Sequence, residues 1–94
     1  MTLGERSLER EVLALFDRQA DILLPRIRYG IPAVAAASAH TLKGSAVGIG
    51  AFRVAQAAES VEQAKDADVP AAVEVLSAAI AEAKAEIARL LRGH

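Results

Sequence analysis

Cysteine and tryptophan are absent from the 94-residue chain, and aromatic residues make up only 3% of it. Without cysteine the chain can form neither disulfides nor thiolate metal sites. The scarcity of aromatic side chains and the net charge of -1 leave neither a stacking surface nor a positive field, so we expect no nucleic-acid partner. The chain also lacks a signal peptide and any apolar run of about 18 residues. We therefore expect a cytoplasmic protein without membrane contact.

Alanine and aliphatic residues make up much of the chain. Hydrophobic residues account for 53% of the sequence, and 22 residues are alanine. Alanine is the strongest helix former, and the aromatic residues that favour strands are few. A chain of this length forms one small domain. The composition thus predicts a single all-α domain over residues 1–94.

Turn-forming residues divide the chain into four helical segments. Pro25 should bend or end the first helix, and Gly30 can close it. Pro32 suits the first turn of a second helix, and Gly50 marks the next break. Asp68 is suited to cap the last helix. We predict an antiparallel four-helix bundle, up-down-up-down, with helices at residues 5–28, 31–49, 52–66 and 69–92.

Apolar residues within the segments recur at three- and four-residue steps, the spacing of amphipathic helices that face a core. The predicted inward residues are Leu8, Val12, Leu15, Phe16, Ile22 and Leu23 in the first helix, Val54, Ala58 and Val61 in the third, and Val73, Leu76, Ile80, Ala83, Ile87 and Leu90 in the fourth.

The second helix has two different sides when its residues are placed at intervals of about 100°. Its core side carries Ile31, Ala35, Leu42, Ala46 and Ile49, with Ser38 and Ser45 among them. Its opposite side carries Ala33, Ala36, Ala37, His40, Lys43, Gly44 and Val47. The imidazole of His40 is therefore predicted to project into solvent from a surface of small side chains.

Two neighbours of His40 point to phosphoryl chemistry. Glycine inside a helix costs about 1 kcal/mol relative to alanine, yet Gly44 lies one turn after His40 in an alanine-rich chain. The missing Cβ lets another protein or a tetrahedral phosphoryl group approach the imidazole. Lys43, three residues after His40, can place its ammonium group against phosphoryl oxygens.

An acidic residue of the third helix is predicted to orient the imidazole. If the second and third helices form an antiparallel hairpin, residues whose numbers sum to about 102 lie at one height, which puts Glu62 level with His40. A carboxylate there could accept a hydrogen bond from one ring nitrogen and leave the other as the nucleophile. Gln63 takes this role if the turn differs slightly. Glu59 lies level with Lys43 and could form an ion pair with it.

Residues 39–46, AHTLKGSA, together with the later Gly50-Ala51 and Glu59, resemble the signature of the histidine-containing phosphotransfer (HPt) family. The family pattern is H-x-L-K-G-[SA]-[SA] with a downstream Gly-Ala turn. The resemblance implies a four-helix bundle in which the exposed His40 exchanges a phosphoryl group with an aspartate of a response-regulator receiver domain.

The resemblance also implies roles for the neighbours of the histidine. It assigns phosphoryl stabilisation to Lys43 and close approach of the partner to Gly44. The family position that matches Glu62 holds glutamine in many members and glutamate in the chemotaxis-kinase branch, and either side chain hydrogen-bonds the histidine. Glu62 therefore does not select a branch.

In the mechanism that follows, an imidazole nitrogen attacks an aspartyl phosphate in line, and the receiver domain supplies Mg²⁺, so the chain needs no cofactor of its own. The chain carries no Walker motif and no kinase glycine loop, so we expect a phosphocarrier that cannot phosphorylate itself. Receiver domains, and a hybrid sensor histidine kinase, are the expected partners of a monomer. The expected docking residues are Ala36, Ala37 and Val47, with nearby parts of the first helix.

Other interpretations remain open at this point. The alanine-rich face around His40 could be a helix–helix contact in an interaction or dimerisation module. The chain could also be the phosphoacceptor piece of a larger sensor kinase, although Met1 and a complete bundle favour a free-standing protein. No metal site is expected, because the only other histidine is His94, the last residue.

Overall fold

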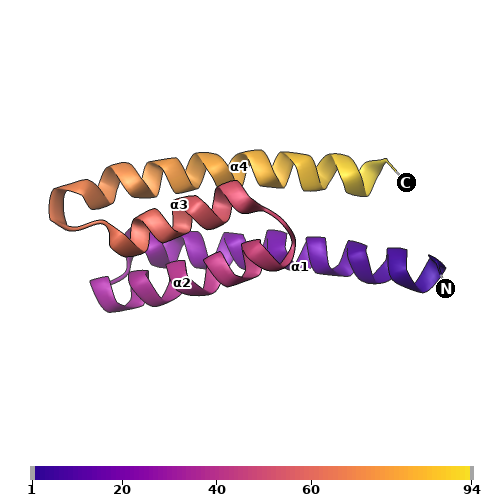
Figure 1. Cartoon of the computed structure of the whole chain (residues 1–94), viewed down its shortest axis with the longest axis horizontal. Helices are drawn as coiled ribbons and strands as arrows, with labels where there is room; N and C mark the ends of the chain where they lie inside the picture. The colour runs from indigo at the N-terminus through magenta and orange to yellow at the C-terminus, as the bar shows by residue number, and fades with distance from the viewer. Residues whose placement is uncertain (1, 94) are drawn as a thin grey trace.

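The computed structural model describes residues 2–93, with side chains described from residue 7 onward. Four α-helices and one short 3₁₀-helix fill most of this range, and residues 2–93 contain no strand. The helices lie side by side along one long axis (Figure 1). They are α1 (Thr2–Tyr29), α2 (Pro32–Gly48), α3 (Phe52–Gln63) and α4 (Val69–Arg92), and the 3₁₀-helix η1 spans Asp66–Asp68. The all-α prediction is confirmed.

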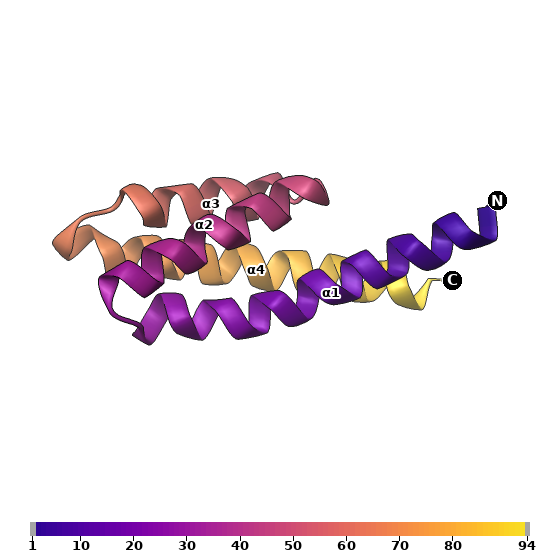
Figure 2. The ribbon, with the colours of Figure 1, turned by 90° about the horizontal axis from the view of Figure 1, so that it is seen from below.

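Each helix packs against two others, α1 and α3 both contacting α2 and α4. The result is an elongated bundle with extents of 48 × 19 × 18 Å. Figure 2 shows the N-terminal part of α1 and the C-terminal end of α4 extending past the hairpin formed by α2 and α3. The bundle therefore has a four-helix section and a two-helix end.

Polar contacts between α1 and α4 show how these two helices lie. Arg10 donates a hydrogen bond to the carbonyl oxygen of Leu91 at 2.9 Å. Further along α1, Asp17 and Asp21 accept hydrogen bonds from Lys84 at 2.7 and 2.9 Å. Burial lowers the pKa of Lys84, but the hydrogen bonds and the negative charges of Asp17 and Asp21 together outweigh it and leave that pKa raised. Later residues of α1 pair with earlier residues of α4, so these helices run in opposite directions.

Pro25, which was expected to bend or end the first helix, lies inside α1 and does not end it. Proline removes the hydrogen bond to the carbonyl of Asp21, four residues earlier. Both residues are exposed, so water can solvate that carbonyl, while Leu23 and Ile27 on either side of the proline are buried in the core. Gly30 closes the helix as predicted, its N–H donating to the carbonyl of Arg26 at 3.0 Å.

The remaining boundaries depend on two unusual backbone positions. Gly50 has a φ of 79°, which permits the tight turn between α2 and α3. The third helix was predicted to reach residue 66 but ends at Gln63, because Ala64 and Lys65 have an extended backbone, with ψ of 147° and 138°. Asp66, which follows, has a φ of 51°. The last helix begins at residue 69 as predicted. Asp68 precedes it, but its side chain makes no capping hydrogen bond.

The buried core draws on all four helices and is rich in alanine. Its apolar members are Phe16, Ala20, Leu23, Ile27, Ala39, Leu42, Ala46, Val54, Ala55, Ala57, Ala58, Val61, Val73, Leu76, Ile80 and Ile87. All three core residues predicted for the third helix are among them. Leu90 of α4 is exposed because it lies in the two-helix end, and Ala83 is half-buried.

The core prediction for the first helix is largely wrong. Only Phe16 and Leu23 of the predicted stripe are buried, whereas Leu8, Val12, Leu15 and Ile22 are exposed. The stripe that faces the core adds Ala20 and Ile27, and Leu15 and Ile22 precede core residues by one position, which turns them away by about 100°. In α2, Ala39 is buried although it was assigned to neither side, and Ile31 is exposed because it precedes the helix.

We predict that Leu76→Ala lowers the free energy of unfolding by about 2–5 kcal/mol, because it leaves a cavity at a fully buried position. Urea denaturation followed by circular dichroism measures the change. Val75→Ala is the matched control, because Val75 is exposed and its truncation should change stability by less than about 1 kcal/mol. Equal losses for the two variants would contradict this description of the core.

Candidate functional site

His40 stands on the outer side of α2, and its side chain is 74% exposed. The buried residues of this helix, Ser38, Ala39, Leu42 and Ala46, lie toward the bundle interior. Helical periodicity therefore separates the structural side of α2 from the side that presents the imidazole. The predicted exposure of His40 is confirmed.

The imidazole is hydrogen-bonded to one residue of α3. Nδ1 of His40 lies 3.0 Å from Oε2 of Glu62. The other carboxylate oxygen, Oε1, is buried and has no hydrogen-bond partner among the described residues, so the polar contact of Glu62 is with the histidine. A carboxylate oxygen only accepts hydrogen bonds, so Nδ1 carries the hydrogen. In the neutral ring, Nε2 then holds the lone pair that can act as a nucleophile.

The structure thus places Glu62 beside His40, as the predicted hairpin register requires. Gln63, the alternative partner, is the exposed last residue of α3. The two neighbours differ in direction because successive residues of a helix point about 100° apart.

A second polar contact joins α2 and α3 one turn away. Nζ of Lys43 lies 2.8 Å from Oε1 of Glu59, which is the ion pair that the sequence allowed. The hydrogen bond and the charge of Glu59 raise the pKa of Lys43, and those of Lys43 lower the pKa of Glu59. Both groups are therefore charged at neutral pH, and the ammonium group is already engaged when His40 carries no phosphoryl group.

Packing within the bundle does not require glycine at position 44. A Cβ built on Gly44 would have no neighbouring atom within 4 Å outside its own helix backbone. The position is exposed, one turn from His40. The absence of a side chain therefore leaves the surface beside the imidazole open to another molecule.

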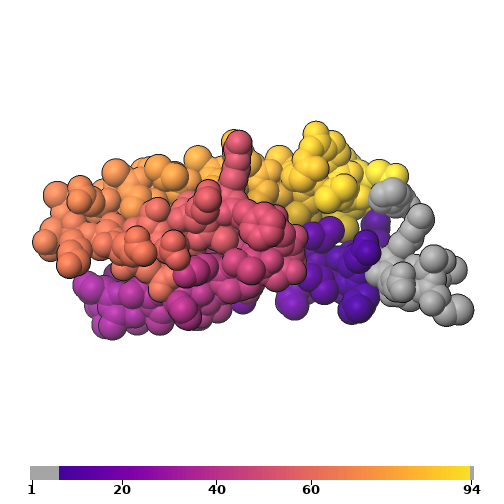
Figure 3. All heavy atoms as spheres, in the orientation of Figure 1, coloured from indigo at the N-terminus to yellow at the C-terminus, as the bar shows by residue number. Residues whose placement is uncertain are grey.

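The surface around His40 contains small and apolar side chains. Ala36, Ala37 and Val47 are exposed on α2, and Figure 3 shows α2 and α3 forming one continuous face of the molecule. On α1, Leu15 and Ile22 are also exposed. At about 100° per residue, they are turned well away from Asp17 and Asp21, which contact Lys84 of α4.

Sequence reasoning missed the exposure of Leu15 and Ile22 on α1. Leu15 and Ile22 were assigned to the core because their spacing fits one helical face. The signal that could have separated them was a second apolar stripe one residue out of step, formed by Phe16, Leu23 and Ile27. Two adjacent stripes on one helix indicate a buried face and a neighbouring exposed apolar face.

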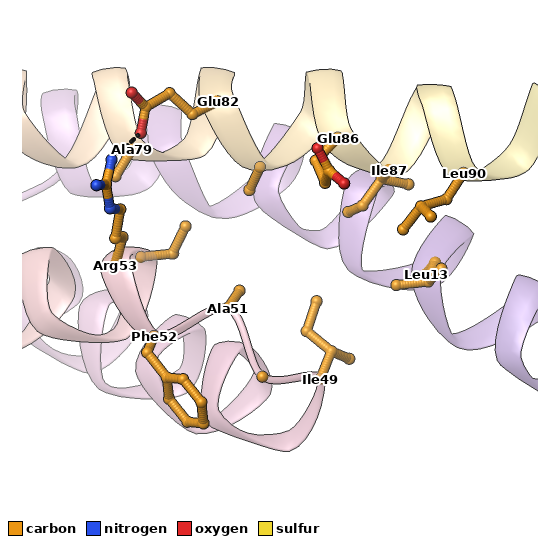
Figure 4. Close-up of a pocket in the computed structure, with 13 residues that line it drawn as sticks. Leu13, Ile49, Ala51, Phe52, Arg53, Ala79, Glu82, Glu86, Ile87 and Leu90 are labelled. Carbon is orange, nitrogen blue, oxygen red and sulfur yellow. Dashed lines mark hydrogen bonds and ion pairs between the residues drawn. The ribbon is translucent and has the colours of Figure 1, made fainter.

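An apolar pocket of about 310 Å³ lies elsewhere, at the two-helix end of the bundle (Figure 4). Leu13 of α1, the turn before α3 and Ile87 and Leu90 of α4 line it, and His40 does not. Figure 4 shows Arg53 reaching across to Glu82 at its edge. The histidine is thus presented on an open surface.

No group of three or more histidine, aspartate or glutamate residues that could hold a metal ion occurs in the part of the chain that the structure describes. His94, the other histidine, lies outside the described residues. Within residues 2–93, no helix is both long enough and apolar enough to cross a membrane.

The chain matches the family model of the Hpt domain over residues 11–92, nearly its whole length. No curated protein and no solved structure matches it. The chain therefore belongs to the Hpt domain family, the histidine phosphotransfer modules of two-component phosphorelays. Hpt domains are phosphocarriers rather than enzymes, and they interact with receiver domains of response regulators. The family assignment made from the motif is confirmed.

We predict that Lys43→Gln returns the pKa of the Glu59 carboxyl upward, toward its ordinary value, because the hydrogen bond and charge that lower it are lost. Side-chain carboxyl NMR titration of the two proteins measures this. Because the pKa of Glu59 is lowered in the folded chain, the ion pair stabilises the fold above pH 4.5, and this stabilisation is lost as the pH falls through the lowered pKa. Because the pKa of Lys43 is raised in the folded chain, the same ion pair stabilises the fold below pH 10.5, and this stabilisation is lost as the pH rises through the raised pKa. An unchanged Glu59 titration would mean that the pair does not form in solution.

Proposed function

We propose that this chain is an antiparallel, up-down-up-down bundle that carries a phosphoryl group on Nε2 of His40 between receiver domains. The observation that carries the proposal is the contact between Nδ1 of His40 and Glu62 at 3.0 Å, on an imidazole that is 74% exposed. One ring nitrogen is held by the protein, and the other is free to react with a partner.

The proposed transfer step follows from this arrangement. The lone pair of Nε2 attacks the phosphorus of an aspartyl phosphate on the receiver domain. An N–P bond forms while the P–O bond breaks, and the electron pair of that bond leaves with the aspartate carboxylate. The ring becomes positively charged with its hydrogen kept on Nδ1, where the carboxylate of Glu62 stabilises it. Onward transfer is the reverse of this step on a second receiver.

Lys43 and Gly44 have complementary roles in the proposal. The ammonium group of Lys43 stabilises phosphoryl oxygens, and the open space at Gly44 lets the receiver backbone come close. Mg²⁺ and most of the charge stabilisation belong to the receiver, so the chain needs no metal or cofactor of its own. It has no nucleotide-binding motif, and we propose that it has no autokinase activity.

We propose that receiver domains dock on the face that surrounds His40. Ala36, Ala37 and Val47 give it a flat apolar surface, and Leu15 and Ile22 extend it onto α1. Small side chains around the nucleophile allow a broad partner surface to reach it without steric conflict. We propose a cytoplasmic monomer that receives its phosphoryl group from such a domain, including one carried by a hybrid sensor histidine kinase.

The experiment that tests the function is transfer from a phosphorylated receiver domain of the same organism in the presence of Mg²⁺. The wild-type chain is expected to acquire a phosphate that is labile in acid and stable in base, whereas His40→Gln should acquire none. Gel detection of labelled phosphate after acid or base treatment measures both. Equal labelling of a His40→Gln variant with an unchanged circular dichroism spectrum would disprove the assignment.

We predict that Glu62→Ala lowers the transfer rate by about two- to tenfold, the equivalent of one lost hydrogen bond. Glu62→Gln should lose less, because its amide oxygen can still accept from Nδ1–H. Rapid-quench transfer from one receiver to the three proteins gives the rates. Equal rates for Glu62→Ala and wild type would show that the hydrogen bond does not assist transfer.

A further inference from the structure

Glu59 binds the ammonium group of Lys43, the same group that would stabilise a phosphoryl group on His40. In the unphosphorylated chain, Nζ of Lys43 is 2.8 Å from Oε1 of Glu59. Both side chains remain partly exposed, at 34% for Lys43 and 49% for Glu59, so the pair can rearrange without opening the core. Glu59 and Glu62 lie one turn apart on α3 and contact two residues that also lie one turn apart on α2.

Few positive charges lie near His40 to offset the charge of a phosphoryl group. Lys43 is the only lysine or arginine of α2. The arginine at the start of α3, Arg53, instead contacts Glu82 of α4. A phosphoryl group on Nε2 would bring about two negative charges to a surface that already holds the carboxylates of Glu59 and Glu62. The ammonium group has three N–H donors, so the carboxylate and the phosphoryl oxygens would divide them.

We propose that Glu59 is a positioning residue that competes with the phosphoryl group for Lys43. This proposal rests on the proposed function, which places the phosphoryl group on His40. By retaining part of the hydrogen bonding of Lys43, Glu59 leaves the phosphohistidine less stabilised than Lys43 alone would make it. The consequence is a greater tendency to pass the phosphoryl group onward.

The test uses phosphoramidate as a phosphoryl donor, because it needs no receiver domain. The phosphoryl group moves from the nitrogen of phosphoramidate to Nε2 of His40, and ammonia leaves. With phosphoramidate and ammonia held in fixed excess, ³¹P NMR gives the ratio of phosphorylated to free chain. We expect Glu59→Gln to raise this ratio by about two- to fivefold, the range that the energies of exposed ion pairs allow.

Glu82→Gln is the matched control. It removes the same charge from an exposed glutamate that also pairs across two helices, with Arg53, and it should leave the ratio unchanged. A second comparison tests whether Glu59 acts through Lys43. In a Lys43→Gln background, adding Glu59→Gln should have no further effect, because there is no ammonium group left to release.

The outcomes separate this proposal from the proposed function. Phosphorylation of wild type on His40 with an unchanged ratio in Glu59→Gln overturns the role of Glu59 and leaves the carrier function standing. An equal rise in the Lys43→Gln background also overturns it, because Glu59 would then act on the phosphoryl group directly. A wild-type chain that takes no phosphate on His40 from phosphoramidate or from receivers overturns both.

Discussion

The close packing of α2 against α3 determines where the polar groups around His40 lie. Ala39, Ala46 and Ala58 have no exposed surface in this structure, and Ala55 and Ala57 are nearly as buried. Small side chains in the helix contacts let backbones approach closely, and this closeness lets a histidine of one helix hydrogen-bond a glutamate of the next. The register of the two helices then assigns partners to both His40 and Lys43.

The two sides of α2 have different physical tasks. The inner side holds the bundle together through buried residues such as Leu42, and the outer side presents the imidazole without enclosing it. A phosphocarrier needs this separation, because its nucleophile must enter the active site of another protein. A pocket around His40 would shield the nitrogen from the receiver domain, which in the proposed transfer supplies the metal ion and the aspartate. The pocket that the bundle does form is lined by other residues.

The polar contacts on the outer side balance two requirements. In the proposed transfer, Glu62 holds the ring and stabilises the positive charge that forms on it, whereas Lys43 stabilises the negative charge of the phosphoryl group. A carrier that bound the phosphoryl group too strongly would keep it. The pairing of Lys43 with Glu59 offers a physical means of moderating that binding, since a donor shared between two acceptors stabilises each of them less.

The sequence by itself determined the helical class, the family and the starts of the last two helices, because these depend on local signals. Composition, the motif around His40 and turn residues such as Gly50 act over a few neighbouring positions. The exposure of His40 also followed from helical periodicity alone. The antiparallel hairpin predicted that Glu62 lies at the same height as His40. The choice between Glu62 and Gln63 as the partner of His40 depended on the actual register of α2 and α3.

Only the tertiary structure decided which apolar stripe of α1 is buried and whether Pro25 ends the helix. Both stripes of α1 are apolar and lie one residue apart, and the packing of α2 and α4 selects the one with Phe16 and Ile27. The same burial holds α1 together across Pro25. These outcomes depend on energies shared among several helices, which no single segment of the sequence contains.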